Sequence, residues 1–168
     1  MRYLDHVQEA ISSLGYIKPE YDTALAIMLE SNEGQHPKAI ALAYRKIGEQ
    51  ISRDEKRALG LRSNVLFSRE ALDSLTAAGL LKLRDAHVTT LLCASLSFFR
   101  SRMIDDCRKA NINQFKIIAA FKDCPGCNEL GGQIIGANHA AMLRPKNCIR
   151  EACALSIMPW IDHLASIK

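Results

Sequence analysis

Four cysteines in the last forty-five residues constrain this chain more than any other feature of its sequence. Cys124 and Cys127 form a CxxC pair, and Cys148 and Cys153 follow after twenty intervening residues, with four residues between them. Two thiol pairs at this separation are typical of a zinc ribbon, in which each short loop presents two thiolates to one tetrahedral ion. The sequence therefore predicts a structural zinc site made by Cys124, Cys127, Cys148 and Cys153.

The CPGC segment at residues 124–127 also permits a thiol redox couple. A strand followed by such a segment is similar to the thioredoxin-like arrangement, in which the next helix lowers the pKa of the first thiol. Here Gly131 and Gly132 come soon after the cysteines, and glycine is a poor helix former. We therefore expect a tight turn and a returning strand after Cys127. This expectation favours the metal site and leaves the redox couple as an alternative.

A zinc-dependent hydrolase or nuclease is a further alternative. Catalytic zinc keeps an open coordination position and needs an acid/base group, as in HExxH hydrolases or the HxE and PCxxC pattern of nucleobase deaminases. Neither pattern occurs in this sequence. His139 lies between the cysteine pairs and could replace one of them as a ligand. The Asn138–His139 pair is similar to one part of HNH nucleases, whose other residues have no clear positions here. The sequence does not support an enzymatic function.

The cysteine motif as a whole resembles the cysteine-rich tail of phage head-morphogenesis proteins, the minor head or Mu F-like family. In that family a CPxCxxLxG element is followed by a proline-flanked asparagine-cysteine, another cysteine, and a closing proline after a short strand. Lys146 stands where the family often has histidine, and the spacing to the fourth cysteine is longer than the common CxC. The resemblance implies zinc binding and, less specifically, a phage-related role. The matching positions, which span about a quarter of the chain, are Cys124, Pro125, Cys127, Leu130, Gly132, Pro145, Asn147, Cys148, Cys153 and Pro159.

The first two thirds of the chain carry the patterns of helices. Apolar residues recur at helical spacing, and proline, serine, aspartate and glycine stand where helices favour them at their ends. One predicted helix extends from Pro37 through Ile51, another from Ser68 to Gly79, and the longest follows Asp85. Cys93 and Cys107 lie on or beside the apolar face of the longest helix and are expected to be buried as small apolar side chains. The other predicted boundaries are Gly15, Pro19, Asp54 and Gly60.

Helical periodicity stops at Asn111, and the remaining segments favour strands. Residues 115–121 are rich in β-formers, the glycine-bounded residues 131–137 read as a second strand, and residues 154–162 as a third. The predicted fold class is therefore mainly α. We predict a helical domain over residues 1–112 and a small, β-rich, zinc-stapled and zinc-ribbon-like segment over residues 113–168.

Composition and charge limit the cellular location and the binding partners that we expect for this chain. The longest apolar stretch, LLCASLSFF, is shorter than the ~20 residues of a membrane helix, and MRYLDHVQEA lacks the pattern of a secretory signal. We expect a soluble, cytoplasmic protein, in which structural disulfides are rare. The net charge of +4 is uneven, with −3 in residues 1–44, +4 in residues 45–84 and +3 in residues 85–168. We expect a module that binds a protein or a nucleic acid, with partner and oligomeric state unresolved.

Overall fold

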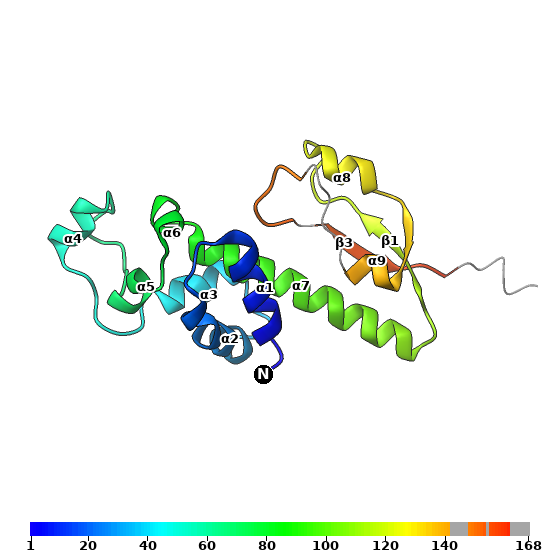
Figure 1. Cartoon of the computed structure of the whole chain (residues 1–168), viewed down its shortest axis with the longest axis horizontal. Coiled ribbons are helices and arrows are strands. Elements are labelled where there is room, and N and C mark those ends of the chain that lie inside the picture. The colour runs from blue at the N-terminus through cyan, green and yellow to red at the C-terminus, as the bar shows by residue number, and fades with distance from the viewer. Residues whose placement is uncertain (142–147, 154, 162–168) are drawn as a thin grey trace, which may run out of the picture. The chain divides into compact units, whose positions relative to one another are not determined.

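The computed structural model describes residues 1–141, 148–153 and 155–161. Contacts divide the chain into two compact units, residues 1–95 and the part that follows from Leu96. The first unit is helical, and the second contains a small three-stranded sheet (Figure 1). The chain is therefore mainly α with a small C-terminal β-rich segment, which confirms the predicted fold class.

The helices of the first unit begin and end largely where local sequence signals place them. The first helix ends at Gly15, which adopts a left-handed φ of 67° and donates its N–H to the carbonyl oxygen of Ile11. Proline occupies the first position of η1 and of α3, where its missing N–H costs nothing. The elements are α1 (Leu4–Leu14), η1 (Pro19–Tyr21), α2 (Asp22–Ser31), α3 (Pro37–Tyr44), α4 (Arg53–Ala58), α5 (Arg69–Asp73), α6 (Ala77–Leu81) and α7 (Ala86–Lys109).

Helix α7 is the long helix expected after Asp85, and the division into units falls within it, between Ser95 and Leu96. The predicted domain boundary, between residues 112 and 113, lies beyond the end of α7 and before the first strand. Cys93 and Cys107, both on α7, are half-buried rather than fully buried.

Two predicted helices are shorter in the structure. Helix α3 ends at Tyr44, although Ile47 and Ile51 continue the apolar spacing, because Gly48 adopts a φ of 82° that a right-handed helix excludes. The predicted helix from Ser68 to Gly79 is interrupted after Asp73.

The interruption between α5 and α6 has a local cause. Leu75 pairs with Ile17 in an isolated antiparallel bridge, and the Thr76 hydroxyl accepts the N–H of Gly79 at 3.0 Å. Threonine side chains compete with the helical backbone in this way and favour N-cap positions. Gly79 therefore lies inside the short helix α6 instead of ending a longer helix.

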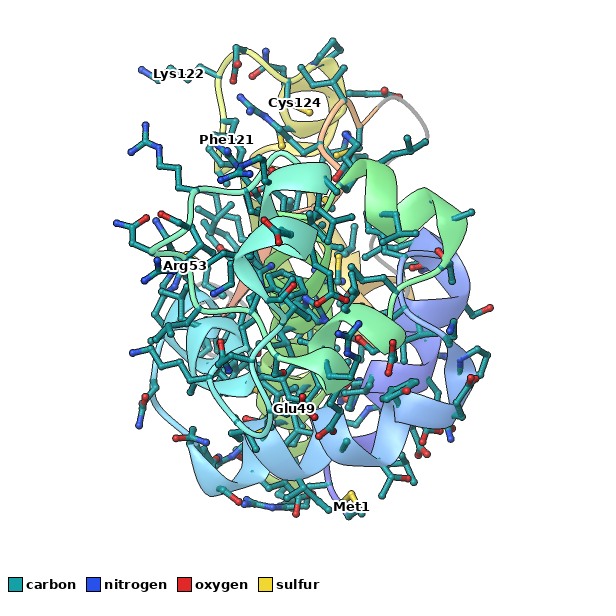
Figure 2. All side chains as sticks on the ribbon, turned by 90° about the vertical axis from the view of Figure 1, so that its left-hand side faces the viewer. Met1, Glu49, Arg53, Phe121, Lys122 and Cys124 are labelled. Atoms are coloured by element: carbon teal, nitrogen blue, oxygen red, sulfur yellow. The ribbon has the colours of Figure 1, made fainter. Side chains whose placement is uncertain are left out.

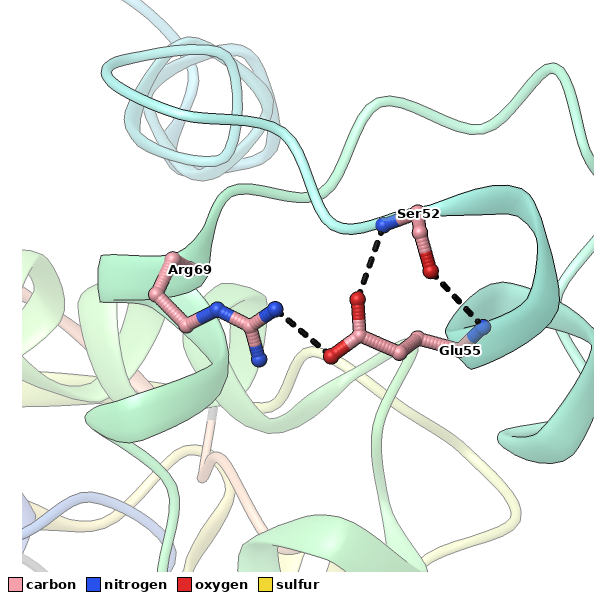
Figure 3. Close-up of polar contacts among 3 residues, drawn as sticks. All are labelled: Ser52, Glu55 and Arg69. Atoms are coloured by element: carbon pink, nitrogen blue, oxygen red, sulfur yellow. Dashed lines mark hydrogen bonds and ion pairs between the residues drawn. The ribbon is translucent and has the colours of Figure 1, made fainter.

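Helix α4 begins with a capping box, and an ion pair joins that box to α5 (Figure 3). The Ser52 hydroxyl accepts the Glu55 N–H at 3.2 Å, and the Glu55 carboxylate accepts the Ser52 N–H at 2.9 Å. The same carboxylate contacts the Arg69 guanidinium at 2.6 Å. The Ser52 N–H and then Arg69 lower the pKa of Glu55 to about 2. Helix α4 thus begins after Ser52, and its first turn is tied to the first turn of α5.

Gly79 is required by the close approach of α6 to the segment after α1. A Cβ at this position would collide with the carbonyl oxygen of Tyr16 and lie 3.0 Å from the Tyr16 carbonyl carbon. The Thr76 N–H donates to this same carbonyl oxygen at 3.0 Å, so the backbone there is already fixed.

We expect Gly79→Ala to lower the free energy of unfolding by about 2–3 kcal/mol. The overpacking penalty against rigid backbone exceeds the gain of about 1 kcal/mol from the better helix propensity of alanine. Urea unfolding followed by circular dichroism measures the difference. Gly136→Ala is the control, since nothing lies within 4 Å of its added Cβ and its φ is not positive. Equal stability of the two variants would contradict the collision.

The second unit is built on an antiparallel sheet of three strands, in the order β2 (Ile134–Gly136), β1 (Gln114–Ile118) and β3 (Ser156–Pro159). Phe115 and Ile117 point from the central strand into the core, and Ile117 lies opposite Ile157. Helix α9 packs against β1 and β2 (Figure 1). In the described part of the chain, no helix is long and apolar enough to cross a membrane. The elements are β1 (Gln114–Ile118), α8 (Pro125–Leu130), β2 (Ile134–Gly136), α9 (Ala137–Ala141) and β3 (Ser156–Pro159).

Candidate metal centre

The four cysteines named by the sequence share the apolar core of the second unit. Cys124 and Cys127 are buried, with 0% and 1% of their surface exposed, and Cys148 and Cys153 are half-buried against the same cluster. Cys107 packs there as well, from α7. The buried members of the cluster are Ile104, Phe115, Ile117, Cys124, Cys127, Ala137, Ala140, Leu155 and Ile157.

The first cysteine pair is presented by the start of α8. Cys124 is the N-cap residue of this helix, with extended φ and ψ angles of −96° and 115°, and Pro125 occupies the first helical position. Proline forces the residue before it into an extended conformation and is preorganised for a first helical turn. Cys124 and Cys127 therefore lie on either side of the sharp change of direction where the loop enters the helix.

The prediction that no helix follows the CPGC segment was wrong. Helix α8 uses the six residues Pro125–Leu130 and ends before the glycines, so Gly131 and Gly132 terminate the helix rather than prevent it. Gly132 has a φ of 84° and donates its N–H to the carbonyl oxygen of Ile117, which returns the chain to β1. The glycines form the expected turn, but this turn follows helix α8 instead of following Cys127 directly.

The second cysteine pair is brought to the first by contacts of the residues around it. Arg150 forms an ion pair with Asp123 at 2.7 Å, and its guanidinium lies 4.7 Å from the centre of the Phe121 ring. Phe121, which precedes α8, and Cys124, at the start of α8, are both labelled in Figure 2. Residues 148–153 are therefore held against residues 121–124, although 23 residues separate Cys124 from Cys148.

The thiols of the two pairs contact one another in a chain. Interaction with the side chains of Cys127 and Cys148 contributes to lowering the pKa of the Cys124 thiol, and interaction with Cys153 and Cys124 contributes to raising the pKa of the Cys148 thiol. The Cys148 thiol also donates to the carbonyl oxygen of Arg150 at 3.5 Å. These contacts connect both pairs through the sulfur atoms of Cys124 and Cys148.

Backbone amides make Cys124 the most easily ionised thiol whose pKa is resolved in this cluster. Hydrogen bonds from the backbone of Ile149, and then from that of Cys127, lower the pKa of Cys124 to about 7. Burial raises the pKa of Cys127 and of Cys148. A metal ion binds cysteine as the thiolate, so each thiol of the site would have to lose its proton. The positive charge of the ion would favour that loss by lowering the pKa of the thiols.

The donor set suits zinc better than harder cations, because thiolates are soft ligands and four of them complete a tetrahedral site. Across the described ranges of the chain, no group of three or more Cys, His, Asp or Glu side chains already has an arrangement that could hold a metal ion. The thiol contacts are pairwise, so binding would require the four sulfur atoms to converge to Zn–S distances of about 2.3 Å.

Other residues singled out by the sequence lie elsewhere or outside the described ranges. His139 is exposed on α9, a position that gives no support to its role as a ligand. Of the positions matched to the phage family, Pro145 and Asn147 lie outside the described residues, as does Lys146. The ion pair between Asp123 and Arg150 was not predicted from the sequence. The only indication of it in the sequence is that two residues of opposite charge each lie close to a cysteine pair.

The fold and the cysteine cluster define a class of protein. It is a mainly helical chain with a small antiparallel sheet, in which four cysteines from two segments of the chain share one core and could hold a metal ion. Comparison with protein-family models, with curated proteins and with solved structures gives no match.

Proposed function

We propose that this chain is a zinc-binding protein whose C-terminal unit is stabilised by a structural site of Cys124, Cys127, Cys148 and Cys153. The observation that carries the proposal is that all four cysteines pack in one apolar cluster, which brings the two pairs together. The backbone amides at Cys124 support it, because they favour the thiolate that zinc binds.

The size of the C-terminal unit supports a structural role for the metal. Its strands have five, three and four residues, and short sheets of this kind need additional packing or a staple to be stable. Zinc would join residues 124–127 to residues 148–153, and its binding free energy would become folding free energy.

The metal content of the protein tests the proposal. The chain purified without chelator is expected to carry about one zinc ion per molecule, as measured by elemental analysis. A variant with serine at all four positions is expected to carry none, whereas Cys93→Ser is expected to keep the full amount. Cys93 is a suitable control because it lies in the first unit. A wild-type chain that takes up no zinc while its four thiols are reduced would overturn the site.

The proposed biological role is that of an interaction module for a protein or a nucleic acid. The net charge of +4 and its concentration after residue 44 support an acidic partner. The resemblance of the cysteine motif to phage head-morphogenesis proteins supports a phage-related role. A pull-down with the zinc-loaded chain, in which bound protein and nucleic acid are quantified separately at low and high salt, distinguishes the two partners.

A thiol redox protein is the second candidate, and the position of Cys124 favours it. Cys124 is the N-cap of α8 and its pKa is lowered to about 7, as in proteins that use such pairs for thiol–disulfide exchange. The burial of both sulfur-bearing residues opposes it, since exchange requires access by another thiol. Rapid formation of a Cys124–Cys127 disulfide under mild oxidation, in a chain free of zinc, would favour this candidate over the zinc site.

A further inference from the structure

A cavity of about 340 Å³ in the first unit has three arginines in its wall. Its volume lies at the lower end of the range for small-molecule sites. The wall is built by the end of α3, by the segment between α4 and α5, and by the residue two positions before α7. Its lining residues are Arg45, Leu61, Arg62, Val65, Phe67 and Arg84.

Arg45 is fixed in this wall by hydrogen bonds, and no carboxylate among the described residues forms an ion pair with it. Its Nε donates to His87 Nδ1 at 3.3 Å, and its Nη2 donates to the carbonyl oxygens of Leu83 and Arg84 at 3.4 and 2.9 Å. The guanidinium lies 5.2 Å from the centre of the Phe67 ring. With 6% of its surface exposed, Arg45 is a positive charge at a buried position.

The groups that accept hydrogen bonds from Arg45 are neutral. His87 Nδ1 accepts a hydrogen bond, so the ring proton is on Nε2, which donates to the Ser74 hydroxyl at 2.9 Å. Asp85 acts on Arg45 through its charge but forms no ion pair with it within the described residues. A buried guanidinium without a paired carboxylate is costly, and an anionic ligand would offset that cost.

Arg62 and Arg84 add two further positive charges at the exposed part of the wall. Arg84 donates from Nη2 to the carbonyl oxygen of Gly60 at 3.4 Å, and no described carboxylate pairs with either side chain. Leu61, Val65 and Phe67 supply apolar surface beside these charges. The cavity therefore combines three guanidinium groups with an apolar wall.

We propose that this cavity binds a small phosphate monoester. The phosphate dianion matches a cluster of guanidinium groups in charge and in its capacity for bidentate hydrogen bonds, better than a single carboxylate does. The organic part of the ligand packs against Leu61 and Val65. This inference does not rest on the zinc proposal, because every lining residue belongs to residues 1–95.

Isothermal titration of the full chain with phenyl phosphate, inorganic phosphate and phenol tests the proposal. Phenyl phosphate is expected to bind most tightly, inorganic phosphate more weakly because it lacks the apolar group, and phenol not at all. Arg62→Gln and Arg84→Gln are each expected to weaken phenyl phosphate binding roughly tenfold, the loss of one charge-assisted hydrogen bond. Both side chains are exposed, so circular dichroism should show an unchanged fold.

The control variant is Arg53→Gln, which removes the same charge from an exposed arginine that does not line the cavity; Arg53 is labelled in Figure 2. It is expected to bind phenyl phosphate as the wild type does. An equal loss in this variant would overturn the proposal, since binding would then follow overall charge. No phenyl phosphate binding by the wild type, together with Arg62-dependent binding of a single-stranded oligonucleotide, would also overturn it in favour of a nucleic-acid contact.

Discussion

Cys124→Ser is expected to unfold the C-terminal unit while the helical unit stays folded. Structural zinc contributes on the order of 10 kcal/mol to the folding of small domains, and a serine hydroxyl does not replace a thiolate in the site. Cys124 is fully buried and contacts both Cys127 and Cys148, so its loss separates the two pairs. Addition of a strong chelator to the wild type is expected to have the same effect.

Trp160 provides the measurement, because it is the only tryptophan of the chain and lies directly after β3. The backbone N–H of Trp160 donates to the carbonyl oxygen of Gln114, and Lys116 Nζ lies 5.5 Å from the centre of the indole ring. Unfolding of the sheet should shift its fluorescence to longer wavelength, while helical circular dichroism decreases only in part. Cys93→Ser is the control and should retain the wild-type emission. An unchanged emission spectrum in Cys124→Ser and in chelator would contradict a structural site.

Acidification is expected to destabilise the helical unit through His87. Burial, and then the charge of Arg45, lowers the pKa of His87 from the ordinary 6.5 to about 3. Between these values the unfolded chain binds a proton that the native state does not bind. The free energy of unfolding should therefore fall as the pH decreases from about 6.5 towards 3, by about 1.4 kcal/mol per pH unit. Over the whole window the loss amounts to several kcal/mol.

Urea unfolding of wild type and His87→Gln at pH 7, 6, 5 and 4, followed by circular dichroism, isolates this contribution. Glutamine can still accept a hydrogen bond from Arg45 and donate one to Ser74, but it does not titrate. The free energy of unfolding of this variant should therefore fall less steeply with decreasing pH than that of the wild type, by about 1.4 kcal/mol per pH unit. His36→Asn is the matched control, because His36 is an exposed N-cap of α3 and asparagine also caps helices. If His87→Gln and the wild type lost stability in parallel, the native state would not exclude the proton.

The boundaries that the sequence predicted best are those set by one residue and its immediate neighbours. Gly15, Pro37 and Ser68 each define a helix end by their own backbone preference or by a hydrogen bond within three residues. The three predicted strands also form, although each is shorter than its apolar segment. Sheet hydrogen bonds extend only as far as a partner strand is present, and that length is not local information.

The predictions that failed depended on competition between local signals. The apolar spacing through Ile51 favours a longer α3, but the left-handed conformation of Gly48 decides against it. Gly131 and Gly132 indicated a turn correctly, yet Pro125 started a helix in the six residues that remained before them. Both signals are present in the sequence, and the sequence alone did not show that a helix would form before the turn.

The sequence by itself determined the composition of the candidate site. Thiol chemistry and the spacing of two pairs singled out the four cysteines, because residue type and separation along the chain are properties of the primary structure. Only the tertiary structure decided that Cys124 contacts Cys148, that Arg150 pairs with Asp123, and that a cavity lined by Arg45, Arg62 and Arg84 exists at all. Such groups are far apart along the chain, and only the packing of its elements can bring them within contact distance.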